Sequence, residues 1–173
     1  MASYYYLISS LPMLSADGGM PFSYAEFLKM CQANVSEETY RQLEGLTLSS
    51  KDGPLLDEWG TFYNGLTKEL NSQRSAKLGK PYPAVTDKEP ASASVASAAI
   101  SARDPLTAER ILLDYEFDQL DVMVGLHNFD DYVLFGYALK LKLLERVNSF
   151  EKEKGKKEFN DILKDLEDRV TSL

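Results

Sequence analysis

Residues 130–150 read DDYVLFGYALKLKLLERVNSF, and this stretch decides the fold that the sequence predicts. It begins with Asp130 and Asp131, either of which can accept a hydrogen bond from the free N–H groups of a first helical turn. At about 100° per residue, apolar side chains cover two opposite sides of the helix and leave one narrow polar arc. One side carries Val133, Leu134, Tyr137, Leu141 and Leu144, the other carries Tyr132, Leu139, Leu143 and Val147, and the arc carries Asp131, Phe135, Lys142, Glu145 and Arg146.

A helix this apolar needs neighbours on at least two sides, so we interpret it as the central helix of an all-α domain. Lys140 is the exception on its apolar side, where it projects between Tyr137 and Leu144. A desolvated ammonium group is unfavourable unless it is paired or its stem carries it to water. Lys140 therefore either extends to solvent or pairs with an acid of the preceding helix, Asp118 or Asp121.

The first half of the chain contains several helix-start signals. Ser23, with Glu26 three residues later, makes a capping box, and Ser36 caps a second short helix that Gly45 closes. These two helices are expected to form a hairpin. Residues 4–10 are left open: YYYLI favours a strand, but no second strand is available to pair with it, so an extended arm and a helical turn both remain.

A longer helix is expected from Asp52-Gly53-Pro54 to about Leu78, because proline suits the first turn of a helix. Trp59, the only tryptophan, lies on its apolar side and is interpreted as a core anchor rather than a platform for a ligand. The apolar residues that recur at helical spacing are Leu55, Trp59, Phe62, Tyr63, Leu66 and Leu70.

The composition then shifts. Residues 79–104 hold three prolines followed by an Ala/Ser run, which is typical of a linker or a surface excursion. SVASAAISA within it is able to form a helix of small residues, marginal without a partner. Asp104-Pro105 starts a helix that stops near Gly125, and with residues 130–150 it makes an antiparallel helical hairpin.

Beyond residue 150 the chain is strongly charged, with a narrow apolar stripe that predicts a terminal or detachable surface helix. The stripe consists of Phe159, Ile162, Leu163, Leu166 and Val170. The expected organisation is an N-terminal part (1–78), the segment 79–104 and a C-terminal part (105–173), packed as one compact domain of antiparallel helical hairpins.

Composition excludes several classes of function. A net charge of −8 argues against a nucleic-acid backbone or an anionic lipid surface as the main partner. The single cysteine, Cys31, excludes an internal disulfide and fits a reducing compartment, and we interpret it as a buried structural thiol. The apolar N-terminus lacks a basic segment and is too short to span a membrane, so direct membrane insertion is not expected and a cytoplasmic location is.

No catalytic, cofactor or metal site is predicted. His127 has no cysteine or second histidine to complement it, and the glycine-rich nucleotide-binding loops and the nucleophile elbow are absent. The paired carboxylates Asp130-Asp131 and Glu37-Glu38 stand at helix starts, where capping explains them. The residues alone therefore predict a non-enzymatic binding or structural protein; a deep pocket lined by converging acids would reopen the enzyme reading.

Three segments carry a resemblance: SYYYLISSLPML (residues 3–14), PFSYAEFLKMCQANVSEETYRQLEGL (21–46) and DPLTAERILLDYEFDQLDVMVGLHNFDDYVLFGYALKLKLLERV (104–147). The first and third resemble an uncharacterised bacterial family encoded among the subunits of V/A-type ATPases in spirochaetes, chlamydiae and Bacteroidetes. The second and third are also similar to the V/A-ATPase C subunit (d in eukaryotes), an all-helical protein about twice as long. In that subunit a late core helix holds a tyrosine and a charged turn, matched here by Tyr137, Lys140, Lys142, Glu145 and Arg146.

The resemblance implies a non-catalytic subunit or assembly factor of a V/A-type ATPase, such as a C-like adaptor between the central rotor shaft and the membrane ring. It implies ATPase subunits as partners, no catalytic residues, and a place in the cytoplasm or at the inner membrane through the ATPase. Lys142, Glu145 and Arg146 are the predicted partner contacts, together with the outer face of the last helix. The alternative is a stand-alone regulatory module that binds a partner helix in a groove left by residues 80–104.

Overall fold

The computed structural model describes residues 4–53, 55–83 and 89–149, together with residues 155, 159–160 and 162–164. In this part of the chain every regular element is a helix and no strand occurs, which confirms the all-α prediction. The helices of residues 4–149 are α1 (Tyr5–Ser10), α2 (Tyr24–Gln32), α3 (Glu37–Glu44), α4 (Leu56–Lys77), α5 (Pro90–Ile100), α6 (Pro105–Val124) and α7 (Asp131–Asn148). None of the described helices combines the length and the apolar run that crossing a bilayer requires.

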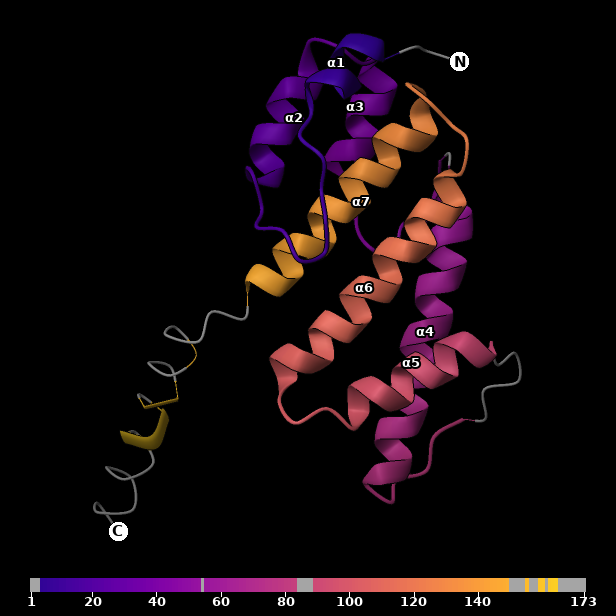
Figure 1. Cartoon of the computed structure of the whole chain (residues 1–173), viewed down its shortest axis with the longest axis vertical. Coiled ribbons are helices and arrows are strands. Elements are labelled where there is room, and N and C mark those ends of the chain that lie inside the picture. Colours follow the sequence, from indigo (N-terminus) through magenta and orange to yellow (C-terminus); the bar gives the residue numbers. More distant parts are fainter. Residues whose placement is uncertain are drawn as a thin grey trace.

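Helix α7 lies at the centre of the larger of two hydrophobic clusters, with the α1–α3 group on one side and α6 on the other (Figure 1). No residue between Asp131 and Val147 is exposed. Asp130 caps the helix as predicted, because its carboxylate accepts a hydrogen bond from the Val133 N–H. One assignment is wrong: Phe135, placed on the polar arc by periodicity, is completely buried. The helix is therefore covered on more sides than its sequence pattern predicts.

The smaller cluster joins the second half of α4 to α5 and to the beginning of α6. Helices α4 and α6 contribute to both clusters, whereas α7 contributes only to the larger one. The two long helices thus connect an upper and a lower part of the molecule in Figure 1. The buried residues of the smaller cluster are Leu66, Leu70, Ala96, Ala99 and Leu112.

Helix α5 occupies the Ala/Ser run for which a linker or surface excursion was expected. Ala96 and Ala99 are buried in the smaller cluster, the Gln73 side chain donates to the Ala93 carbonyl at 3.0 Å, and the hydroxyls of Ser92 and Tyr115 lie 3.1 Å apart. The small side chains allow α5 to approach α4 and α6 closely. Residues 90–100 are therefore a packed helix rather than a free linker, and residues 84–88 lie outside the described residues.

Helix α4 begins later than predicted. Its N-cap is Leu55, which has φ +67° and offers no capping side chain, and the first helical residue is Leu56. A leucine in the left-handed region is strained. The Leu55 side chain is 3% exposed within the larger cluster, so burial offsets the backbone strain. The predicted helix start at Asp52-Gly53-Pro54 is therefore too early, and Pro54 itself lies outside the described residues.

The question left open for residues 4–10 is decided by contacts distant in sequence. The Tyr4 N–H donates to the Phe129 carbonyl at 2.7 Å, and the Tyr4 hydroxyl donates to Asp131 at 2.8 Å. These bonds attach the start of α1 to the start of α7. The segment is a helix, and Leu7 is buried in the core.

Most local predictions hold. The Ser23–Glu26 capping box is present, and Ser36 and Asp104 cap α3 and α6. Trp59 is fully buried, and its Nε1 donates to the Leu48 carbonyl at 3.0 Å, which confirms the core-anchor interpretation. Cys31 is fully buried, as predicted.

In the C-terminal segment (residues 150–173), Phe159, Ile162 and Leu163 are helical and 62%, 60% and 41% exposed. Leu166 and Val170, the other residues of the predicted stripe, lie outside the described residues. Three large apolar side chains of this segment are therefore in contact with solvent.

Candidate protein-binding groove

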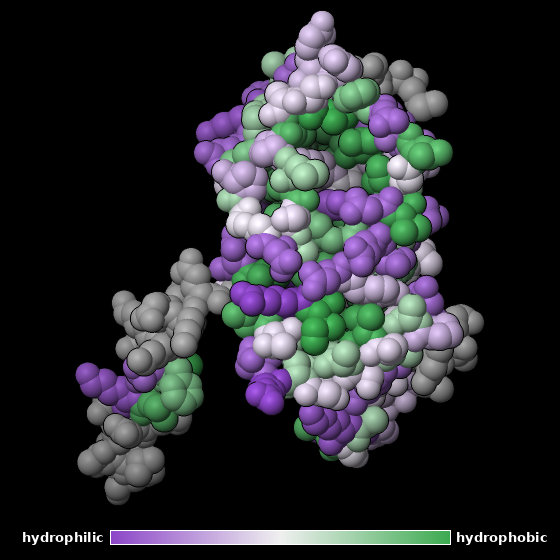
Figure 2. Space-filling view, in the orientation of Figure 1, coloured by the Kyte–Doolittle hydropathy of each residue, from purple (hydrophilic) through white to green (hydrophobic). Residues whose placement is uncertain are grey.

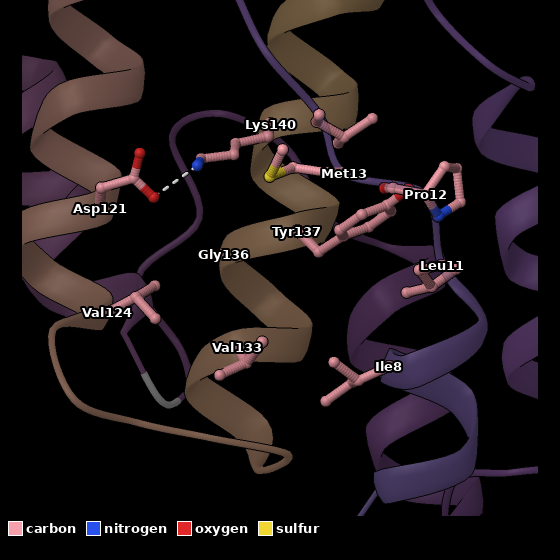
Figure 3. A pocket seen from close by; sticks show the side chains of 11 residues that line it. Ile8, Leu11, Pro12, Met13, Asp121, Val124, Val133, Gly136, Tyr137 and Lys140 are labelled. Atoms are coloured by element: carbon pink, nitrogen blue, oxygen red, sulfur yellow. Dashed lines mark hydrogen bonds and ion pairs between the residues drawn. The ribbon is translucent and has the colours of Figure 1, made fainter.

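A groove of about 230 Å³ separates the N-terminal segment from α6 and α7. Figure 3 shows the chain from Ile8 to Met13 along one wall. Val124 of α6 and Val133 and Tyr137 of α7 form the opposite wall, and Lys140 and Asp121 stand at one end. The walls are mostly apolar, so the groove suits a hydrophobic side chain of a partner.

The N-terminal wall is fixed in place by α7. The Tyr137 hydroxyl donates to the Pro12 carbonyl at 3.0 Å. Burial raises the pKa of Tyr137 to about 12, so the hydroxyl keeps its proton and remains a donor at neutral pH. Together with the two Tyr4 hydrogen bonds, this contact sets the width of the groove before any partner binds.

Gly136 lies on the α7 wall, where the Val124 side chain of α6 lies against it. A Cβ atom at this position would stand 2.6 Å from Val124 Cγ2 and 3.5 Å from Leu55 Cδ2. Only glycine lets the end of α6 pack against α7 here. The prediction from sequence passed over it, although a glycine inside an otherwise strong helix is itself a signal of close packing.

Lys140 pairs with Asp121 across the end of the groove, at 2.6 Å. This is one of the two acids proposed for it, so the paired alternative is confirmed and extension to solvent is not. Its Nζ also lies 5.1 Å from the ring centroid of Phe117. The lysine side chain is 15% exposed and the aspartate 67%, so the charge pair borders the groove on the solvent side.

Large apolar side chains are exposed at the end of the molecule where α1 meets the α6–α7 turn. The ring centroids of Tyr5 and Phe129 lie 4.7 Å apart. This contact joins α1 to the turn between α6 and α7. Figure 2 shows hydrophobic surface in the upper part of the molecule, where these elements lie in Figure 1. We call the following exposed side chains the apolar end: Tyr5 (54% exposed), Tyr6 (84%) and Leu126 (97%) at this end, Val122 (73%) in the last turn of α6, and Met13 (95%) on the groove wall.

The three residues of α7 that were predicted to contact a partner, Lys142, Glu145 and Arg146, all interact with other residues of this chain. Arg146 donates two hydrogen bonds to Glu116, at 2.9 and 2.6 Å, and its Nε donates to Glu109 at 3.0 Å. Glu116 is 2% exposed. Burial alone would lower the pKa of Arg146, but Glu116 and Glu109 raise it above its ordinary value. Arg146 is therefore a structural cation between α6 and α7.

Lys142 and Glu145 attach α2 to α7. The Lys142 Nζ lies 3.7 Å from the centroid of the Tyr24 ring and 3.7 Å from Glu145. Glu145 also accepts a hydrogen bond from the Tyr24 N–H at 3.2 Å. These contacts explain the charged turn of α7 without a partner, and its role in partner binding stays a prediction.

The sequence reasoning missed Glu109 and Glu116, which complete the Arg146 cluster. They stand seven residues apart, two helical turns, on the side of α6 that also carries Leu113 and Leu120. An acid on the apolar side of a helix needs a cation to pair with it. The positions of Glu109 and Glu116 in the sequence could therefore have predicted such a pair.

His127 forms a local contact. Its Nδ1 lies 2.6 Å from Asp130, and its ring stacks on Tyr132 with centroids 4.0 Å apart. Within the described residues, His, Cys, Asp and Glu do not gather in groups of three that would hold a metal ion. This histidine therefore serves the turn that leads into α7.

Residues 96–170 match the model of a protein family described as "Protein of unknown function (DUF2764)". The match begins inside α5, includes α6 and α7, and extends through most of the C-terminal segment. No curated protein matches the chain, and no solved structure does. The match covers less than half of the chain, and it includes the parts of α6 and α7 that contribute one wall of the groove and its bordering charge pair.

Proposed function

We propose that this protein is a non-catalytic subunit or assembly factor of a V/A-type rotary ATPase, and that it docks on its partner through the groove and the apolar end. The proposal is supported by the resemblance of residues 3–14 and 104–147 to a family encoded among V/A-ATPase subunits. These two segments are distant in sequence, yet they form the two walls of the groove.

The observation that carries a docking function is the exposure of the apolar end. Single exposed apolar residues are ordinary on a protein surface. Five large ones beside an apolar groove are not, and such patches mark sites of association. Burying one leucine-sized side chain stabilises a complex by roughly 1.5–3 kcal/mol, so Met13 and Leu126 are the strongest candidate contacts.

The role we favour is that of a C-like adaptor between the rotor shaft and the membrane ring. An adaptor needs a rigid body with separate contact surfaces. The buried Arg146 cluster and the two hydrophobic clusters supply rigidity along α4, α6 and α7. The partners in this proposal are rotor or ring subunits, without nucleic acid and without insertion into the bilayer.

The alternative is a stand-alone helical module that regulates a protein outside the ATPase. The sequence analysis expected this module to bind a partner helix in a groove left by residues 80–104. In the structure, α5 of this segment packs against α4 and α6 instead. Under this alternative the groove beside Tyr137 takes over that role. The identity of the captured partner separates the two readings.

The test is cross-linking mass spectrometry on native membranes, with the wild-type chain and the variants Met13→Glu and Leu126→Glu. We expect cross-links to rotor or ring subunits in the wild type and their loss in both variants, because a charge would be buried at the contact. Leu106→Glu is the matched control, since Leu106 is 38% exposed in the first turn of α6 and does not line the groove. Cross-links only to proteins outside the ATPase would support the alternative instead.

We still predict partner contacts at Lys142, Glu145 and Arg146, but we consider them weaker candidates than Met13 and Leu126. Each already has partners in the fold, so substitutions there are expected to alter stability together with binding. Variants of the apolar end separate these effects, because Met13 and Leu126 are almost fully exposed.

A further inference from the structure

A second hollow, of about 450 Å³, opens at the opposite end of the molecule, where α4 and α5 end and α6 begins. Its apolar surface includes Leu78, which is 69% exposed, and Ile100. Three cations border it: Arg74 and Lys77 in the last turn of α4, and Arg103 in the connection from α5 to α6. We call this site the basic hollow.

The positive charge of the basic hollow exceeds what the fold uses. Lys77 donates to the Ile100 carbonyl at 3.0 Å and so caps the end of α5. The one acid in the wall, Asp104, accepts hydrogen bonds from the Thr107 N–H and hydroxyl. Neither Arg74 nor Arg103 forms an ion pair with any described residue. The wall of the hollow therefore carries three cations against one acid, in a chain of net charge −8.

Helix α7 ends close to this hollow, and the C-terminal segment follows it in the sequence. Arg146, in the last turn of α7, is bonded to Glu109 at 3.0 Å. Glu109 lies one helical turn, about 6 Å, from Pro105 in the hollow wall. Figure 1 shows the end of α7 and the beginning of α6 on the same side of the molecule.

The chemistry of residues 158–168, EFNDILKDLED, complements the basic hollow. This stretch holds five acids and one lysine. Phe159, Ile162 and Leu163 supply apolar side chains at helical spacing, and all three are exposed. Residues 150–157 precede it and can span about 25–30 Å when extended, which is ample for the approach.

We infer that residues 158–168 dock in the basic hollow of their own chain, with Phe159 and Ile162 against its apolar wall and the acids facing Arg74 and Arg103. Docking buries apolar surface that is otherwise exposed and pairs two arginines that lack acidic partners among the described residues. The attraction between exposed charges is screened by salt, so the docked state weakens as ionic strength rises. The apolar end takes no part in this contact. If residues 158–168 prove not to dock in the basic hollow, the proposed function is not affected.

Native lysines provide the test. Lys77 lies at the basic hollow and Lys164 lies within the docking stretch. An amine-reactive cross-linker applied to a mixture of ¹⁴N- and ¹⁵N-labelled full-length chains distinguishes docking within one chain from docking between two. We expect Lys77–Lys164 links whose two peptides carry the same isotope.

Charge reversal identifies the cause. The double variant Arg74→Glu/Arg103→Glu is expected to lower the yield of this link by at least about threefold, because two attractive contacts become repulsive. Arg41→Glu is the matched control, since Arg41 is an exposed arginine on α3. Circular dichroism and thermal unfolding verify that both variants are folded. Phe159→Ser, which leaves the body untouched, is expected to lower the yield as well.

Three results would overturn the inference: no link between the two lysines, mixed-isotope links at about the half that contacts between chains produce in an equal mixture, or a yield that the double charge reversal and Phe159→Ser both leave unchanged. Links between differently labelled chains would instead indicate that a second copy supplies the segment.

Discussion

Arg146 of α7 and Glu116 of α6 form a two-fold hydrogen-bonded pair in the interior, at 2.9 and 2.6 Å, and Glu109 accepts a third bond from the same guanidinium. The pair is the polar centre of an otherwise apolar helix–helix contact. Removing Arg146 leaves the Glu116 carboxylate buried without a cation, whereas removing Glu116 still leaves Arg146 paired with Glu109. Replacing both Arg146 and Glu116 with apolar groups avoids the unpaired buried charge.

Arg146→Met is therefore expected to destabilise the protein by about 3–5 kcal/mol, measured as the free energy of unfolding in urea, because it leaves Glu116 buried without a cation. The double variant Glu116→Leu/Arg146→Met is expected to recover most of this loss. Glu44→Ala, an exposed acid on α3, is the control and should change stability little. A loss below about 1 kcal/mol for Arg146→Met would show that the Glu116 carboxyl reaches water or another partner when Arg146 is removed.

Gly136 and Gly65 allow a comparison between two helical glycines. An added Cβ at Gly136 meets Val124 at 2.6 Å, whereas at Gly65 it meets nothing within 4 Å. Alanine favours a helix over glycine by about 1 kcal/mol. Gly65→Ala should thus raise the thermal midpoint and Gly136→Ala should lower it. Combining Gly136→Ala with Val124→Ala should restore part of the loss; equal gains at both glycines would contradict the close approach of α6 and α7.

The Cys31 thiol should be unreactive in the native protein. Burial raises its pKa to about 12, so almost no thiolate is present at pH 8. A chromogenic disulfide reagent at pH 8 is expected to label the native chain at the rate of unfolding and to label the chain at once in urea. The raised pKa also stabilises the fold below the thiol's unfolded-state pKa, and this contribution is lost as the pH rises toward 12. Immediate labelling of the native chain would contradict burial.

The Asp104 cap of α6 should make the free energy of unfolding depend on pH in the acidic range. Hydrogen bonds from Thr107 lower the pKa of Asp104 below 3.8. A lowered pKa contributes stability that is present above pH 3.8 and is lost as the pH falls through the folded-state value. Asp104→Asn keeps a capping side chain but does not titrate. The free energy of unfolding, measured in urea, should fall less between pH 5 and pH 3 in the Asp104→Asn variant than in the wild type. Identical losses in the two proteins would argue against Asp104 as the titrating group.

Much of the helical pattern was predictable because it depends on local chemistry. Ser23, Ser36, Asp104 and Asp130 each place an oxygen where the first turn of a helix has free N–H groups, and all four are observed as caps. The pair of Lys140 with an acid of α6 was also within reach, since an ammonium group on an apolar side needs compensation.

Other features depended on contacts that no local pattern contains. Phe135 is completely buried in the larger hydrophobic cluster, although periodicity puts it on the polar arc. Leu55 adopts a strained backbone because its side chain reaches the core. Helix α5 is packed because α4 and α6 offer it two partners, whereas its own sequence of small residues is only marginally helical.

The sequence by itself determined the all-helical class, the central position of residues 130–150 and most helix starts, because capping and apolar periodicity act over a few residues. Only the tertiary structure decided that α1 and α6–α7 enclose a groove, that Arg146 is shared by two acids of α6, and that three cations gather at the basic hollow. Each of these joins residues from separate helices, and their distances depend on how the helices pack rather than on any one helix.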